Sequence, residues 1–112
     1  MVTSASAPAR AAVNKFGVTD FRVLIASVTL VLSVASQDAA GNTEPAMQLT
    51  LNGTASQKIV YAADGTPVVA TDTSKTVQAV GAFNAFVAAA GTAQQKADAM
   101  DAYLQAQGIY PA

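Results

Sequence analysis

The stretch FRVLIASVTLVLSVA, residues 21–35, decides how this chain folds. Its aliphatic and β-branched residues alternate with Ser and Thr, a pattern typical of an extended strand. We therefore predict one long strand over residues 21–35. A hydrophobic helix, or the core of a secretion signal preceded by Arg22, is the alternative interpretation. The uncharged run from Val23 to Gln37 is shorter than the roughly 18–20 residues that a membrane helix needs, so a membrane partner is not expected.

Residues 1–20 show no sustained hydrophobic period and are rich in Ala, Ser and Thr. We predict an extended N-terminal arm over 1–20, followed by a single α+β domain over 21–112. In an assembly, such an arm would dock on a neighbouring subunit.

Residues 36–45 form a polar, turn-rich segment. Asp38, Asn42 and Glu44 offer oxygen atoms for calcium, but their spacing differs from that of an EF-hand, so we interpret the segment as a solvated loop. The run Asp38–Thr43 resembles a hairpin found in bacterial immunoglobulin-like repeats. Because the likeness covers only this loop and its neighbours, we interpret it as a shared turn.

Residues 46–71 predict a three-stranded antiparallel meander, because Asn-Gly and Asp-Gly turns divide three apolar runs. A three-residue loop over Asn52–Thr54 pairs apolar residues best. A two-residue loop at Asp64–Gly65 sets Tyr61 opposite Val68. Pro67 makes the third strand an edge strand. The glycosylation sequon at Asn52–Thr54 is interpreted as part of the turn.

Two C-terminal helices are predicted, over 72–90 and 92–107. Oxygen atoms of Thr71, Asp72 and Thr73 would cap the first helix, which Gly91 would end. The first helix is apolar nearly all round, so we expect it to be packed on more than one side. Its apolar stripe comprises Val77, Val80, Phe83, Phe86 and Val87.

The second helix begins with a capping box of Thr92 and Gln95 and closes at Gly108. Because so little chain joins the two helices, we expect a helical hairpin. Asp98 and Asp101 are placed on its solvent side. The tail Ile109–Pro111 is a short apolar docking piece.

The chain has no His, Cys or Trp, so it lacks the commonest general base, the thiolate nucleophile and the soft metal ligands. Asp98 and Asp101 share a helix face, but two carboxylates without a third ligand make a weak metal site. Tyr61, Tyr103 and Tyr110 fit interface or core positions. We predict no catalytic, cofactor-binding or metal-binding residue, no cofactor, and no enzyme activity.

Hydrophobic residues make up 52% of the 112-residue chain and charged residues only 12%, with a net charge of −1. This balance disfavours nucleic acid as a partner, because binding phosphates needs a cluster of cations. It also leaves more apolar surface than one small core can cover, which predicts contacts with other copies of the chain.

We therefore expect a non-enzymatic structural subunit of a large assembly. Its partners would be itself and the other structural subunits of the same particle. A bacteriophage-type virion protein, either a capsid decoration protein or a tail or head–tail component, fits best, and its location would be the virion. Two alternatives remain. One is an extracellular, pilus-like filament subunit in which residues 21–35 form a helix. The other is a small ligand- or carbohydrate-binding module. The conformation of Val23–Ala35 distinguishes the particle protein from the filament subunit.

Overall fold

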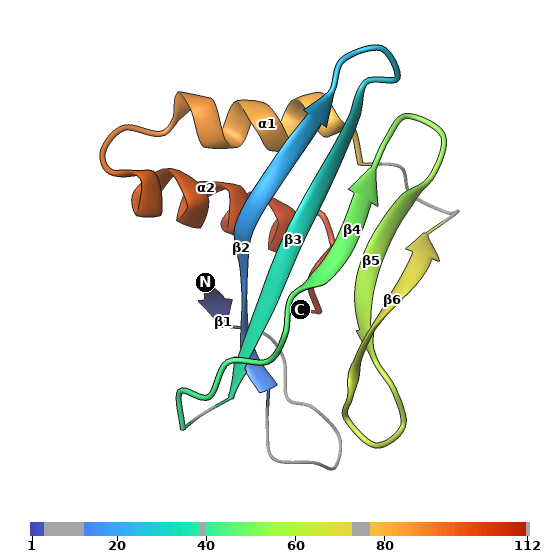
Figure 1. Ribbon diagram of the computed structural model, residues 1–112, viewed down its shortest axis with the longest axis vertical. Coiled ribbons are helices and arrows are strands. Elements are labelled where there is room, and N and C mark those ends of the chain that lie inside the picture. Colours follow the sequence, from blue (N-terminus) through green and yellow to red (C-terminus); the bar gives the residue numbers. More distant parts are fainter. Residues whose placement is uncertain (4–12, 39, 73–76, 112) are drawn as a thin grey trace.

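The predicted α+β class is confirmed by the computed structural model, which describes residues 1–3, 13–38, 40–72 and 77–111. One antiparallel sheet has the strand order β1-β2-β3-β4, and a second contains β5 and β6 (Figure 1). Two helices follow at the C-terminal end. The elements are β1 (Val2–Thr3), β2 (Val13–Leu24), β3 (Thr29–Asp38), β4 (Met47–Leu51), β5 (Ser56–Tyr61), β6 (Pro67–Asp72), α1 (Ala79–Ala88) and α2 (Ala93–Ala106).

The single long strand predicted over 21–35 is wrong, because the chain reverses in its middle. β2 ends at Leu24 and β3 begins at Thr29, so residues 21–35 form the upper part of a β-hairpin. The turn is closed by the Val28 N–H, which donates to the Ile25 carbonyl at 3.2 Å. The alternation of side chains continues on both sides of this turn, and no Gly or Pro marks it. The hydrophobic pattern therefore identified strand without locating the turn.

The predicted arm over 1–20 also needs correction. Residues 13–20 form the first part of β2, while residues 4–12 lie outside the described residues. β1 pairs with β2 through Val2 opposite Phe16 and Thr3 opposite Lys15. The Met1 side chain packs so closely on Gly17 that it leaves no room for a Cβ atom there. The described start of the chain thus docks on its own sheet.

The predicted meander is only half correct. β4 pairs with β3, with Leu49 opposite Leu32, and not with β5. The Asn52 Oδ1 atom accepts the N–H groups of Thr54 and Ala55 at 2.9 and 2.8 Å. This side-chain turn directs the chain out of the first sheet in place of the predicted hairpin loop.

The hairpin at Asp64–Gly65 is confirmed, with its register shifted by one residue. Tyr61 lies opposite Pro67, so the loop has three residues and not two. The Ala62 N–H donates to the Thr66 carbonyl at 2.8 Å, and Gly65 takes a φ of 89°. A positive φ at this point is what a three-residue hairpin loop requires, and Gly adopts it without steric strain.

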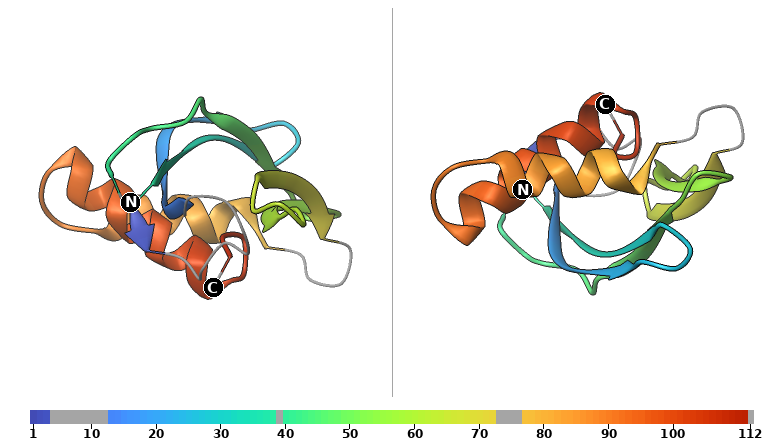
Figure 2. Two further views of the ribbon diagram at one scale, coloured as in Figure 1. Left: turned by 90° about the horizontal axis from the view of Figure 1, so that it is seen from below. Right: turned by 90° about the horizontal axis from the view of Figure 1, so that it is seen from above.

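Both helices cover one face of the four-stranded sheet and leave its other face open (Figure 2). The core lies between these two layers, where the Phe16 and Tyr110 rings stack with centroids 5.7 Å apart. The Ile59 N–H donates to the Ile109 carbonyl at 2.7 Å, so the predicted docking tail packs against its own chain. The other fully buried aliphatic side chains are Leu30, Leu32, Val34, Leu49, Leu51, Met100 and Leu104.

The first helix starts later than predicted. Thr71 and Asp72 belong to β6, and Thr73 lies outside the described residues. α1 begins after Gln78, whose side chain makes no capping hydrogen bond. The Asp72 carboxylate instead lies 3.9 Å from the Lys58 Nζ atom across the β5–β6 pair. Thr71 and Asp72, which the sequence offered as helix caps, are therefore paired in a strand and do not cap α1.

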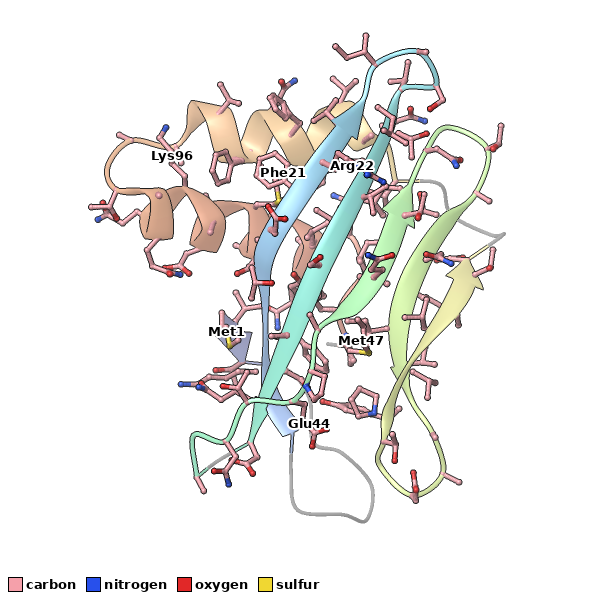
Figure 3. All side chains as sticks on the ribbon, in the orientation of Figure 1. Met1, Phe21, Arg22, Glu44, Met47 and Lys96 are labelled. Atoms are coloured by element: carbon pink, nitrogen blue, oxygen red, sulfur yellow. The ribbon has the colours of Figure 1, made fainter. Side chains whose placement is uncertain are left out.

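The helical hairpin itself is confirmed. The Gln95 N–H donates to Thr92 Oγ1 at 3.2 Å, and the Thr92 N–H donates to Gln95 Oε1 at 2.7 Å, which completes the predicted capping box. Lys96 Nζ donates to the Val87 and Ala89 carbonyls at the end of α1 (Figure 3). A cation at this position compensates the negative end of the helix dipole.

Candidate interaction surface

The tip of the β2–β3 hairpin exposes aliphatic side chains. It projects past the end of β4, close to the start of α1 (Figure 1). Ile25 is 86% exposed, Val28 51% and Val23 42%. Single exposed aliphatic residues are ordinary on protein surfaces, whereas a contiguous group of them marks an interaction site.

Helix α1 extends this group. Val80 and Val87, two turns apart on α1, are 52% and 54% exposed. The sequence placed both in the buried stripe of a helix packed on more than one side; the structure turns them outward, because α1 packs through Ala79 and Ala82. We name the exposed aliphatic residues that line one hollow between the hairpin and α1 the tip patch. It consists of Val23, Ile25, Val28 and Val80. Leu24 alternates to the opposite face of β2, and Val87 lies two turns further along α1, where Lys96 Nζ donates to its carbonyl at 3.3 Å.

A hollow of about 230 Å³ lies within the tip patch, between the hairpin and the first turns of α1. Val23, Ile25 and Val28 line it from the hairpin. Ala79, Val80 and Phe83 line it from α1. Thr29 and Asn84 add polar groups at its border. The hollow is smaller than the roughly 300–1,000 Å³ of sites for small ligands, so its size fits one or two side chains.

No charged residue occurs in either sequence segment that carries the tip patch. Residues 23–37 and 76–95 contain no Asp, Glu, Lys or Arg. Arg22 stands directly before the first of these segments. A surface without charges holds its hydration water weakly and is readily covered by another apolar surface.

The turn inside the tip patch is strained. Val28 has a φ of 48°, in the left-handed region that Gly and Asn favour and β-branched residues avoid. A β-branched residue in this conformation costs on the order of 1–2 kcal/mol. Strain of this kind occurs at functional sites more often than elsewhere, and here it holds an aliphatic side chain in an exposed position.

A second cluster lies beside the middle of β2, where Asp101 of α2 is buried at 1% exposure. Its Oδ1 atom accepts hydrogen bonds from the Tyr110 hydroxyl at 2.8 Å and the Val18 N–H at 2.9 Å. Its Oδ2 atom lies 3.4 Å from the Met1 ammonium. The sequence placed Asp101 on the solvent side of its helix. We name Asp101, Tyr110, Val18 and Met1 the Asp101 cluster.

Burial dominates the electrostatics of this cluster. It raises the pKa of Asp101, although the Val18 N–H, the Tyr110 hydroxyl and the Met1 ammonium oppose the shift. Burial, followed by the adjacent carboxylate, raises the pKa of Tyr110 far above its usual range. Tyr110 is therefore a permanent donor, and the cluster ties α2, β2 and the C-terminal tail together.

Asp98, one turn before Asp101, has a different environment. Its side chain is 49% exposed, and its Oδ1 atom accepts from the Met1 ammonium at 3.0 Å and from Gln94 Nε2 at 2.9 Å. These donors, the ammonium first, lower the pKa of Asp98. The two carboxylates therefore hold one ammonium group between them and do not form an open metal site.

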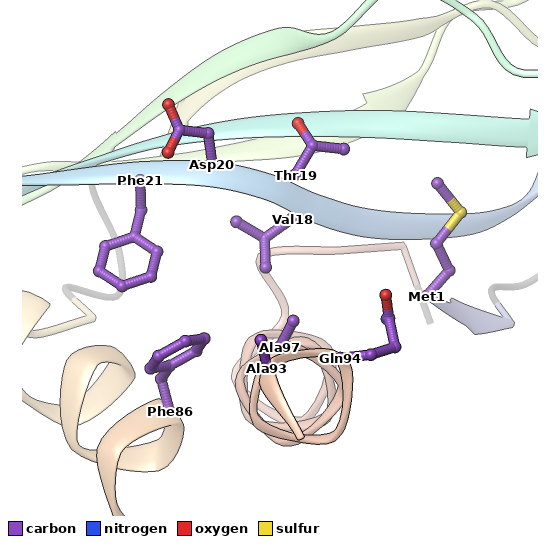
Figure 4. Close-up of a pocket in the computed structure, with 9 residues that line it drawn as sticks. All are labelled: Met1, Val18, Thr19, Asp20, Phe21, Phe86, Ala93, Gln94 and Ala97. Atoms are coloured by element: carbon purple, nitrogen blue, oxygen red, sulfur yellow. The ribbon is translucent and has the colours of Figure 1, made fainter.

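A cleft of about 470 Å³ runs between β2 and the two helices (Figure 4). Phe21 and Phe86 close one end, with ring centroids 5.0 Å apart in an edge-to-face contact. Met1 and Gln94 lie toward the other end, and Asp20 lies on the strand above (Figure 4). The volume of the cleft lies within the roughly 300–1,000 Å³ of small-ligand sites, and among the described residues its polar lining side chains are Thr19, Asp20 and Gln94.

The oxygens considered for calcium serve the loop itself. Asp38 Oδ1 accepts the N–H groups of Ala40 and Asn42 at 3.0 and 2.9 Å, and Asp38 Oδ2 accepts from Asn42 Nδ2 at 3.1 Å. The Asn42 N–H is the main cause that lowers the pKa of Asp38. Among the described residues, no group of three potential metal ligands comes together.

Within the described ranges, no helix has the length and apolar character needed to cross a membrane. No protein-family model matches the chain, and neither a curated protein nor a solved structure matches it.

Proposed function

We propose that this chain is a non-enzymatic structural subunit of a large assembly, acting through contacts with copies of itself and with other subunits. A bacteriophage-type virion protein, either a capsid decoration protein or a tail or head–tail component, is the form we favour. The single observation that carries this proposal is the uncharged tip patch. Its exposed fractions correspond to about 400 Å² of apolar surface, within the roughly 300–600 Å² of the largest patches on monomers, which are often functional.

The edges of the two sheets offer a second kind of contact. Within the described residues, β6 pairs with β5 on one side only, and β1 covers β2 only at Lys15 and Phe16. An edge strand exposes backbone donors and acceptors to which a neighbouring chain can add a strand. Such contacts depend little on side-chain chemistry, which suits a chain without His, Cys or Trp.

The conformation of residues 21–35 favours the particle protein over the filament alternative. That alternative requires a hydrophobic helix at the filament axis, and these residues form a hairpin. The remaining alternative, a ligand-binding module, would use the cleft beside Phe21. The cleft has the volume of a small-ligand site, but only three of the described side chains that line it are polar, so it offers few groups that would orient a sugar.

The proposal is tested on the native source of the protein. Particles banded on a density gradient are analysed by quantitative mass spectrometry beside the unfractionated lysate. We expect peptides of this chain to be enriched in the particle fraction at a fixed ratio to the main shell or tail protein. Recovery only in the soluble fraction, as a monomer, would contradict the proposal.

A further inference from the structure

We propose that the tip patch is a two-fold interface between two copies of this chain, with Ile25 of each copy seated in the hollow of the other. This inference rests on the proposed function, because it names the first partner of a self-associating subunit. It goes further by assigning the dimer a two-fold symmetry. We call the inserted Ile25 side chain the knob and the hollow that receives it the hole.

The knob and the hole are adjacent on one surface. Ile25 is the most exposed of the large hydrophobic residues described, at 86%, and it stands at the border of the hollow. A two-fold axis through the tip patch brings the knob of each copy to the hole of the other at the same time, because both copies present the same surface. The hollow of about 230 Å³ is too small for a typical ligand and large enough for a side chain.

The absence of charge makes the surface compatible with itself. Close to a two-fold axis a charged group meets the same charged group of the other copy, and such like-charge pairs destabilise the contact. The sequence segments behind the tip patch carry no charged residue, and Arg22 lies just outside it. Contact of the patch with itself therefore buries apolar surface without opposing like charges.

The area predicts how strong this contact is. Two copies would bury about 800 Å² of apolar surface in total, below the roughly 1,200–2,000 Å² of standard specific interfaces. We therefore expect a dimer that dissociates on dilution. A lattice of many subunits then adds contacts that each dimer lacks alone.

The strain at Val28 fits the same interpretation. Gly at this position would relieve the left-handed conformation, but it would remove an aliphatic side chain from the wall of the hollow. The valine lowers stability and enlarges the apolar contact surface, which is the expected compromise at a binding site.

The first test measures self-association of the full chain by sedimentation velocity, from about 1 µM to about 1 mM. We expect a monomer–dimer equilibrium in which Ile25→Asp raises the dissociation constant about 100-fold or more, the effect of losing a central hydrophobic anchor. The matched control is Ala63→Asp, the same new charge at the exposed tip of the β5–β6 hairpin, which should leave the constant unchanged.

The second test locates the contact by disulfide formation. Because the chain has no Cys, only the introduced cysteines can form a disulfide. Ile25→Cys and Asn84→Cys proteins are prepared separately and mixed under mild oxidation. Ile25 and Asn84 both line the hollow, so a mixed disulfide dimer is expected. Ile25→Cys mixed with Thr54→Cys, in the exposed turn after β4, should give none above background.

The outcomes separate this inference from the proposed function. If the native chain associates while Ile25→Asp associates equally well and the mixed disulfide is absent, the two-fold interface is wrong and self-association stands. If the native chain is a monomer over the whole concentration range, the two-fold interface is overturned, and the proposed function then depends on the particle fractionation.

Discussion

The tip patch lies at one end of β2 and the Asp101 cluster beside its middle, and the two place side chains in opposite kinds of environment. At the tip, Ile25 and Val28 hold apolar side chains in water on a strained turn. Beside the middle of the strand, Asp101 holds a carboxylate inside the core, where Tyr110 and Val18 donate to it. Each arrangement is unfavourable in isolation, because apolar groups avoid water and charges avoid the interior.

The two regions differ in which groups offset the unfavourable free energy of these side chains. The Asp101 Oδ1 atom accepts two hydrogen bonds from its own chain, and Oδ2 lies 3.4 Å from the Met1 ammonium, so the cluster belongs to folding. Nothing in the described chain covers the tip patch, and we propose that a second copy of the chain covers it. Changes at the cluster should therefore alter stability without altering association, and changes at the tip patch should do the reverse.

The largest effect is expected for Asp101→Ala. It leaves the Tyr110 hydroxyl and the Val18 N–H buried without their acceptor, and should lower the free energy of unfolding by about 3 kcal/mol in urea denaturation. Self-association of the molecules that remain folded should not change. Asp98→Ala, at a half-exposed position, is the control and should have a much smaller effect; a loss below about 1 kcal/mol for Asp101→Ala would contradict a structural role for the cluster.

Tyr110→Phe should destabilise less, by about 1.5 kcal/mol, because it removes one donor and keeps the ring that stacks on Phe16. Chemical denaturation of the single and double variants with Asp101→Ala forms a thermodynamic cycle. The sum of the stability losses of the two single variants should be much larger than the loss of the double variant, since both substitutions remove the same hydrogen bond. Simple additivity would mean that the hydroxyl and the carboxylate act independently.

Val28→Gly is expected to stabilise the fold by about 1 kcal/mol, because Gly accepts the left-handed conformation. Thermal unfolding of the dilute monomer measures this gain. The same variant should dimerise more weakly than the native chain, which would separate stability from association at one residue. Val28→Asn tolerates the same φ and serves as the matched control; a loss of stability in both variants would show that the turn is not strained.

The smallest expected effect concerns pH and has opposite signs at the two carboxylates. The raised pKa of Asp101 means that the folded state disfavours the charged form, so stability relative to Asp101→Asn should rise as pH falls through this raised pKa. The lowered pKa of Asp98 stabilises the fold above the ordinary value, so stability relative to Asp98→Asn should decline as pH falls. Urea denaturation between neutral pH and about pH 3 measures both slopes, and equal slopes would refute the distinction.

Much of the architecture was predictable from local signals. The capping box of Thr92 and Gln95 acts within one helical turn, so it identified the start of α2 correctly. Asp64–Gly65 is a local turn signal and formed a hairpin, although a one-residue difference in loop length moved its register. Structures that depend only on neighbouring residues therefore form where the sequence predicts them, with shifts of about one residue in their bounds or register.

The candidate surface was predictable only in part. The composition indicated excess apolar surface, but the stripe predicted for α1 placed Val80 and Val87 inside. Helical spacing identifies residues on a common face and does not say whether that face meets the sheet. Likewise, Asp101 follows Asp98 by three residues, yet one is buried and the other half exposed. No sequence signal distinguishes them, because the partners of Asp101 come from β2 and from the C-terminal tail.

By itself, the sequence determined the class of fold, the C-terminal helical hairpin, the shortage of charge and the apolar character of residues 21–35. These depend on composition and on contacts between near neighbours, which physical chemistry constrains locally. Only the tertiary structure decided that residues 21–35 turn back at Ile25, that β4 joins β3, and that Asp101 is buried. The physical reason is that strand pairing and burial join residues distant in sequence, so their free energy depends on which surfaces the whole chain brings together.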